Sequence, residues 1–366
     1  MTAPTAAGSV RADPFPSTTV RPRIAPAGPP KEPRMMRAIR SSGDASPARA
    51  ASRLSRLLLA PALLAALVAG LTSCSIKKMA VKSVANSLTS GPDVFSTDED
   101  PQLVRDAIPF GLKTMESLLE VVPRHRGLLL SLCRGFTQYG VAFVQSDADE
   151  VETLDYTKAS AMRDRALKLF LRARNYGLRG LELDHRGITQ WLKLLPDSAA
   201  REIKVKELPM LYWTAASWGS AINLGKDRAE LLADLGAVRA LMDRGLTLDE
   251  GYDGGAFHEA LIILEALPET MGGSPQRARE HFERAVALSK GERASPYVTL
   301  AQSVSVLTQN RAEFRELLAK ALAVDPDRDP NQRLATLILQ QRARQLLKRE
   351  DTLFIESDDA SPEDSR

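Results

Sequence analysis

The stretch SPQRAREHFERAVALSKG, residues 274–291, contains the pattern that decides the fold. Within it, Phe282 is followed three positions later by Ala285, and both share a helical face with Ala278. A small residue lets a partner helix approach closely, whereas a large one fills the groove between neighbouring helices. The stretch therefore predicts a helix that packs against other helices on one side.

The same spacing recurs in three other places along the chain. Those copies are Val238-x3-Met242-x2-Gly245, Phe314-x3-Leu318-x2-Ala321 and Ala166-x3-Phe170-x2-Ala173. In chain order the copies begin 72, 40 and 36 residues apart, the first interval being close to twice the others. Tetratricopeptide helix hairpins repeat about every 34 residues, so the copies predict a lengthened, degenerate version of that repeat. The expected fold class is all-α, an irregular superhelix of tetratricopeptide-like antiparallel helix hairpins over residues 98–355.

Helical periodicity extends through the rest of this region. A helix is expected to begin near Asp100 and Pro101, because proline in a first turn lacks only an N–H that would stay unpaired anyway. Its apolar side is predicted to consist of Leu103, Ala107, Phe110, Leu118 and Leu119. The next helix carries one continuous apolar stripe at helical spacing, made of Leu129, Leu132, Phe136, Tyr139 and Phe143. Sustained alternation of apolar and polar residues is missing, so strands are not expected.

The sequence LLLAPALLAALVAGLTSC, residues 57–74, follows a basic leader and has the order of a secretory signal. Its apolar run is shorter than the roughly 20 residues that span a bilayer. Its last four residues are similar to a bacterial lipobox, which predicts cleavage before Cys74 and acylation of that cysteine. Residues 1–73 are thus expected to be a disordered leader with a lipoprotein signal peptide, for which Met35 or Met36 would be a more usual start. Residues 74–97 are predicted to be a lipidated tether, and 356–366 an acidic, disordered tail.

Charge and cysteine content exclude several classes of function. Residues 1–56 hold ten Lys/Arg and three Asp/Glu, so the chain from Cys74 on keeps 39 basic against 43 acidic residues, a net charge of −4. Such a balance gives no electrostatic basis for binding nucleic acid. Only one cysteine besides Cys74 is present, so no disulfide framework is expected. Cys133 lies on an apolar helical run and is interpreted as a buried, inert thiol.

An ordered set of motifs resembles a known family. The motifs are RALKLFLRARNYGLRGLE (165–182), LYWTAASWGSAINL (211–224), ALPETMGGSPQRAREHFERAVALSKG (266–291) and PYVTLAQS (296–303). Together they are similar to the T-component lipoproteins associated with TRAP transporters. The resemblance implies an all-helical periplasmic lipoprotein, a homotrimer whose subunits enclose ligand-accessible channels, and docking of the transporter's soluble solute-binding component. It implies no catalytic residue.

The tryptophans at 213 and 218 are predicted to have different roles. Five helical positions separate them by about 140°, so they do not share a face. Trp218 falls in line with Leu211, Ala215 and Ile222, which indicates a core residue. Trp213 falls in line with Ser217 and Ser220, a mixed face that suits either a pocket or subunit contact or ordinary packing.

The segment GYDGGAFHEAL, residues 251–261, offers the remaining candidate contacts. Its glycines fit either a tight turn that places Tyr252, Phe257 and His258, or an anion site at a helix start. The spacing matches no phosphate-loop or dinucleotide motif. The four histidines show no metal-ligand spacing, and no catalytic motif or cofactor motif is recognisable.

These observations favour a non-enzymatic, lipid-anchored protein on the periplasmic side of the envelope. Ser75 follows the acylated cysteine where an aspartate would favour retention at the inner membrane, so the outer membrane is expected. The predicted function is docking of a TRAP solute-binding protein, with passage of a small organic ligand through an internal channel. The alternative is a general tetratricopeptide scaffold lipoprotein for cell-envelope assembly.

Overall fold

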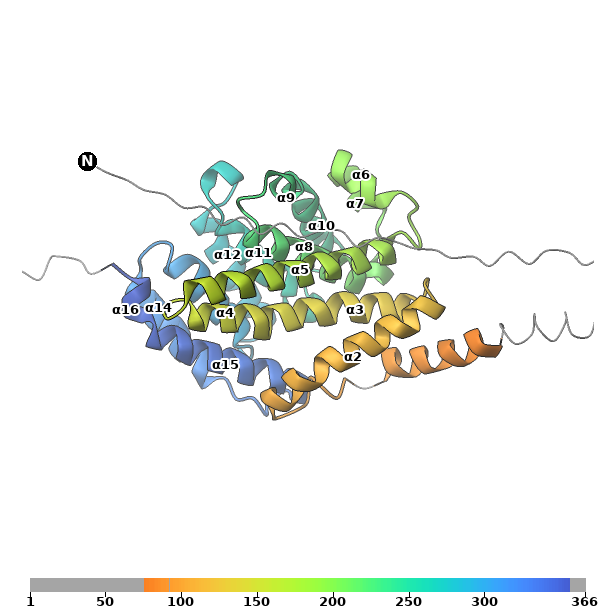
Figure 1. The fold of residues 1–366 in the computed structure, drawn as a ribbon. Coiled ribbons are helices and arrows are strands. Elements are labelled where there is room, and N and C mark those ends of the chain that lie inside the picture. The colour runs from red at the N-terminus through yellow and green to blue at the C-terminus, as the bar shows by residue number, and fades with distance from the viewer. Residues whose placement is uncertain (1–75, 92, 356–366) are drawn as a thin grey trace, which may run out of the picture. The chain divides into compact units, whose positions relative to one another are not determined.

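The computed structural model describes residues 76–91 and 93–355, and all regular structure within these ranges is helical (Figure 1). The predicted all-α class is therefore confirmed. The leader, Cys74 and the acidic tail lie outside the described residues. Within the described ranges, no helix combines the length and apolar character needed to cross a membrane.

The chain first forms a helix over residues 76–90. The helices that follow in the first half are α2 (Pro101–Val121), α3 (Arg126–Tyr139), the π-helical η1 (Gly140–Gln145), α4 (Ser146–Val151), α5 (Tyr156–Leu181), α6 (Ile188–Leu194), α7 (Pro196–Glu202), η2 (Val205–Glu207) and α8 (Leu208–Leu224). The second half contains α9 (Ala229–Leu232), α10 (Leu235–Leu248), η3 (Tyr252–Gly254), α11 (Ala256–Glu265), η4 (Glu269–Met271), α12 (Pro275–Leu288), α13 (Ser295–Leu300), the π-helical η5 (Ala301–Ser305), α14 (Arg311–Ala323), η6 (Pro330–Gln332), α15 (Arg333–Lys348) and α16 (Glu350–Leu353).

Long helices that follow one another in the chain pack side by side. Helix α3 contacts both α2 and α5, α5 contacts α8, and α8 contacts α10 (Figure 1). The second half continues through α11, α12, α13, α14 and α15. One apolar core extends from the helix over residues 76–90 to α11, and another from α11 to α16. Helix α11 contributes to both, with Leu261 and Leu264 in the first core and Ile262 in the second.

The four copies of the repeated spacing fall on α5, α10, α12 and α14. Their small and large residues are buried, except for Phe282, which is half-buried against the second core. The spacing thus identified the packed face of each helix. The superhelix of tetratricopeptide-like hairpins itself stays a prediction.

Helix α2 begins at Pro101 as expected, with the Asp100 carboxylate accepting the backbone N–H groups of Gln102 (2.9 Å) and Leu103 (3.0 Å). The predicted apolar side was partly wrong. Leu103 and Phe110 are 59% and 79% exposed, whereas the buried face of α2 carries Val104, Leu112 and Leu119. By contrast, all five residues of the stripe predicted in the next helix are buried.

The last long helix, α15, packs near the first helices of the described chain. Helix α15 contacts α2 and faces α4 through polar side chains. Arg342 pairs with Asp149 at 2.6 Å, and Arg349 pairs with Glu152 at 3.1 Å. Arg163 of α5 contacts both of these carboxylates. Because these contacts between α15 and the α4 segment are ion pairs, they depend on salt more than the apolar cores do.

Gly245→Ala is expected to destabilise the fold by about 1–3 kcal/mol, although alanine normally favours a helix. A Cβ at this position would lie 2.1 Å from the ring of Phe257, which is fully buried and has no room to move. Gly111→Ala in α2 is the matched control, because nothing lies within 4 Å of its added Cβ. The control should gain about 0.5–1 kcal/mol. Urea midpoints measure both changes, and equal stabilisation of the two variants would contradict the packing.

Candidate functional site

An aromatic cluster brings together three of the residues singled out from the sequence. Its centre is Tyr212 of α8, which the sequence analysis missed. The Tyr212 ring lies 5.0 Å from Trp213, 5.7 Å from Tyr252 of η3 and 5.2 Å from Phe257 of α11, measured between centroids. Edge-to-face and tilted contacts at these distances each add about 0.5–1.5 kcal/mol beyond burial.

The members of the cluster differ in exposure. Phe257 is fully buried and therefore forms the inner, core-facing side of the cluster. Trp213, Tyr212 and Tyr252 are half-buried. Ser217, expected on a wet face beside Trp213, is instead fully buried and donates to the Thr214 carbonyl at 2.9 Å. Ser217 is therefore not part of the surface next to Trp213, whereas Ser220 is half-buried.

Charged groups surround the aromatic cluster. The Arg134 guanidinium of α3 lies 5.8 Å from the Trp213 ring and pairs with Asp93 at 2.5 Å. The Glu259 carboxylate accepts a hydrogen bond from Ser295 Oγ at 2.7 Å, and burial raises the pKa of Glu259. Burial and then the carboxyl groups of Glu259 and Asp253 raise the pKa of Tyr212. Both phenols, Tyr252 with a pKa of about 12, are thus neutral donors at physiological pH.

The glycine-dense segment forms a tight turn between α10 and α11. Asp253, Gly254 and Gly255 have φ values of 44°, 63° and 92°. The amides of Gly251, Gly254 and Gly255 donate within the turn, and Arg293 donates to the Asp253 carbonyl (2.5 Å) and carboxylate (2.7 Å). These amides are already hydrogen-bonded within the turn, and Arg293 binds the turn through Asp253. The arrangement therefore favours the first alternative, a turn that positions aromatic residues, and not an anion site.

His258 lies apart from the aromatic contacts and pairs with a second histidine. Its Nδ1 is 2.8 Å from Nδ1 of His281 on α12, and its Nε2 is 3.0 Å from Glu250, which Arg284 also contacts at 2.6 Å. Donation from His258 Nε2–H to the carboxylate leaves Nδ1 of a neutral His258 as acceptor for His281. If both rings were cationic, two N–H donors would face each other.

The unfolding free energy is expected to decrease as pH falls below about 6.5. Burial, and then His258, lower the pKa of His281. Arg277 also lowers this pKa, whereas Glu265 and Glu280 raise it without reversing the shift. At these pH values the unfolded chain consequently binds more protons than the folded chain, which shifts the equilibrium toward unfolding. A further decrease is expected below pH 4.5, because hydrogen bonds from Arg284 and His258 lower the Glu250 pKa to about 2.

Unfolding midpoints between pH 7.5 and 5.5 test the histidine contribution. His281→Gln should make the decrease shallower than in the parent. His125→Gln should make the decrease shallower independently of this pair, because burial and then Lys82 also lower the pKa of His125. An unchanged slope in His281→Gln would contradict the assignment.

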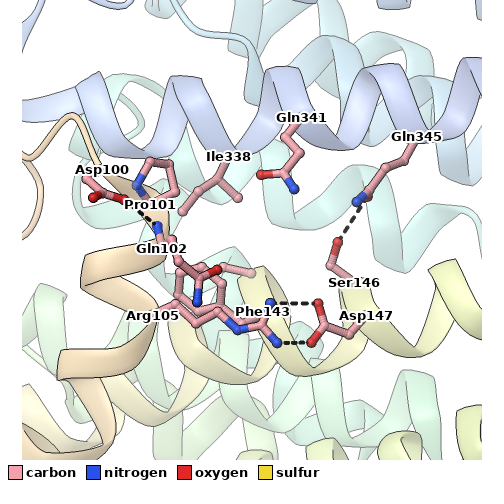
Figure 2. A pocket seen from close by; sticks show the side chains of 11 residues that line it. Asp100, Pro101, Gln102, Arg105, Phe143, Ser146, Asp147, Ile338, Gln341 and Gln345 are labelled. Carbon is pink, nitrogen blue, oxygen red and sulfur yellow. Dashed lines mark hydrogen bonds and ion pairs between the residues drawn. The ribbon is translucent and has the colours of Figure 1, made fainter.

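A pocket of about 270 Å³ lies where α2, the η1–α4 segment and α15 meet (Figure 2). Arg105 of α2 pairs with Asp147 of α4 across its floor, with one contact at 3.0 Å, and lies 5.9 Å from the Phe143 ring. Ser146 donates to Gln345 of α15 at 3.3 Å. Figure 2 shows the Gln341 amide beside the pocket, and Ile338 gives it an apolar wall.

Neither the pocket nor the histidine pair is apparent in the sequence. Asp100 and Gln345 both line the pocket although most of the folded chain separates them. The π-helical η1 contributes Phe143, and π-helical turns often occur at functional sites. Among the described residues, no group of three or more His, Cys, Asp or Glu is arranged to hold a metal ion.

Comparison with known proteins identifies the family. An uncharacterized protein of Treponema pallidum (strain Nichols) is 28% identical over 302 residues, covering 77% of this chain and 94% of that protein. Residues 97–354 match the TRAP transporter T-component family. The matched span contains the aromatic cluster and the pocket, and it includes every motif on which the resemblance rests. The chain therefore belongs to the TRAP transporter T-component family.

Proposed function

We propose that this protein is a lipid-anchored accessory component of a TRAP transporter that docks the solute-binding protein on the periplasmic side of the envelope. The observation that carries the proposal is the family match over residues 97–354, which suggests an accessory role in TRAP transport. In this proposal acylated Cys74 holds the protein at the outer membrane, and the protein assembles as a homotrimer. Its work is binding and not catalysis.

The aromatic cluster supports a docking role for the surface near Trp213. Half-buried aromatic rings beside an arginine are the side chains that dominate the energetics of protein interfaces. Arg134, Trp213 and Tyr252 supply this combination from three separate elements. Helix-hairpin stacks also present extended surfaces that suit a protein partner.

The pocket supports the passage or capture of a small organic ligand. Its volume of about 270 Å³ is just below the range for small-molecule sites, roughly 300–1,000 Å³, so only a compact ligand would fit. Its lining combines an ion pair, amides and apolar groups, which suits a compact polar molecule. We propose that this pocket is one opening of the internal channel.

Trp213→Ala is expected to weaken binding of the solute-binding protein by about 10- to 30-fold, equivalent to about 1.4–2 kcal/mol. Its effect on thermal unfolding should be smaller, because the ring is only half-buried. Trp191→Ala on α6 is the matched control, since that tryptophan is 36% exposed and takes no part in the aromatic cluster. A loss of stability in Trp213→Ala without a loss of binding would assign the residue to packing alone.

Affinity capture from detergent-solubilised envelopes tests the partner class. The acylated protein should recover a TRAP solute-binding protein, and Trp213→Ala should recover less of it. Recovery of envelope-assembly factors in its place would support the general scaffold alternative. Release of Cys74→Ala from the membrane fraction tests the anchor separately.

A further inference from the structure

The helix over residues 76–90 is attached to the rest of the protein along one narrow stripe. Ala85 is fully buried in the first core, and Val81 and Thr89, one turn away on either side, are half-buried. The remaining positions of the helix are exposed. A hydrogen bond of 2.9 Å between Asn86 and His125 adds one lateral contact at the α2–α3 corner.

The side that faces away from this stripe is apolar in the first two turns. At 100° per residue, Ile76 and Met79 lie about 180° and 120° from Ala85. Their exposed fractions are 61% and 68%, and Val84, also on the outer half of the helix, is 50% exposed. No described residue covers them. An apolar face on an exposed helix indicates an interaction site for something other than the described part of this chain.

The same helix is basic, and two of its lysines border the apolar side. Lys77 lies about 100° from Ile76 and Lys82 about 60° from Met79, whereas Lys78 lies about 20° from Ala85. Lys77, Lys78 and Lys82 are exposed, and residues 76–90 contain no Asp or Glu. Although the chain from Cys74 on is acidic overall, this segment carries a local charge of +3. An apolar face with lysines on its borders is typical of helices that lie in a membrane interface, where the lysine stems pack on the lipid while the ammonium groups remain at the headgroups.

The position in the chain points to the same partner. The helix starts two residues after Cys74, so acylation there would keep its first turn within a few ångströms of the bilayer surface. We infer that residues 76–90 form a helix that lies in the membrane interface, with Ile76 and Met79 among the acyl chains and Lys77 and Lys82 at anionic headgroups. This inference rests on the lipid anchor of the proposed function. The helix would make the anchor directional, holding the α2–α3 corner toward the bilayer.

Site-directed fluorescence can test the inference on the intact acylated protein. Cys133 is fully buried and Cys74 would be blocked by its lipid, so Met79→Cys would supply the one reactive thiol. Labelled with an environment-sensitive dye, position 79 should shift to a blue emission and be quenched by brominated lipids in phosphatidylglycerol-containing vesicles. Leu154→Cys is the matched control, because Leu154 is 87% exposed in the loop between α4 and α5. Its dye should stay accessible to aqueous iodide.

The contribution of the lysines is tested by removing their charge. Replacing Lys77 and Lys82 with glutamine should reduce the insertion of position 79 by about 25-fold, because each lysine near an anionic surface contributes about fivefold. Vesicles of phosphatidylcholine alone should give the same reduction in the parent.

The possible outcomes separate the inference from the anchor. Vesicle-bound protein whose position 79 remains open to iodide would overturn the inference and leave the anchor intact. Shielding from iodide without quenching by lipid would show that a second copy or another protein covers this face, which also overturns it. Failure of the parent protein to bind vesicles, with Cys74 open to labelling, would instead refute the lipid anchor of the proposed function.

Discussion

Trp218→Ala is expected to lower the free energy of unfolding by about 3–5 kcal/mol. Its side chain is fully buried in the first core, and its indole N–H donates to Asp234 at 3.2 Å. Arg174 and Lys193 lie 5.4 Å and 5.9 Å from the ring, and Lys193 pairs with Asp234 at 3.0 Å. Truncation would therefore leave a cavity and also remove the surface on which two cations rest.

Trp218→Phe separates the two contributions. It keeps most of the ring volume but removes the N–H donor, so a loss of about 1–2 kcal/mol is expected. Urea denaturation gives both values, with an unchanged slope as the sign that only stability has changed. A loss below about 1 kcal/mol in Trp218→Ala would contradict the placement of this residue in a rigid core.

Local periodicity predicted the helices well because each apolar stripe is a property of neighbouring residues. The stripe that runs along α3 into η1 is buried throughout, and Trp218 is in the core as its helical phase indicated. The phase of α2 was harder to predict, because apolar residues occur on more than one of its sides. Leu103 and Phe110 lie about 100–120° from Val104, and only packing against α3 determines which side is buried.

The candidate site was only partly predictable. Trp213, Tyr252 and Phe257 were identified by residue type and by the glycine-rich turn, and the fold brings them together around Tyr212. The adjacent pair Tyr212 and Trp213 was a signal that could have indicated the centre of the cluster. The His258–His281 contact and the pocket depend on helices that meet only in the folded protein, so no spacing in the sequence reports them.

Glu265→Ala is expected to lower the free energy of unfolding by about 3 kcal/mol, near the lower limit for breaking a buried ion pair. The Glu265 side chain is 4% exposed and ends α11. Its carboxylate pairs with Arg239 of α10 at 2.8 Å and with Arg277 of α12 at 2.6 Å. Both arginines also donate to the Gly272 carbonyl. Partial exposure of both guanidinium groups moderates the loss.

Because α11 contributes to both cores, this substitution is also expected to separate their unfolding. The tryptophans lie on α6 and α8, so fluorescence reports the first core, whereas circular dichroism reports all helices. The two probes should coincide in the parent and diverge in Glu265→Ala. Glu316→Ala is the matched control: its pair with Lys320 is exposed, and such pairs contribute less than about 1 kcal/mol. Coincident transitions in Glu265→Ala would mean that apolar contacts of α11 alone couple the two cores.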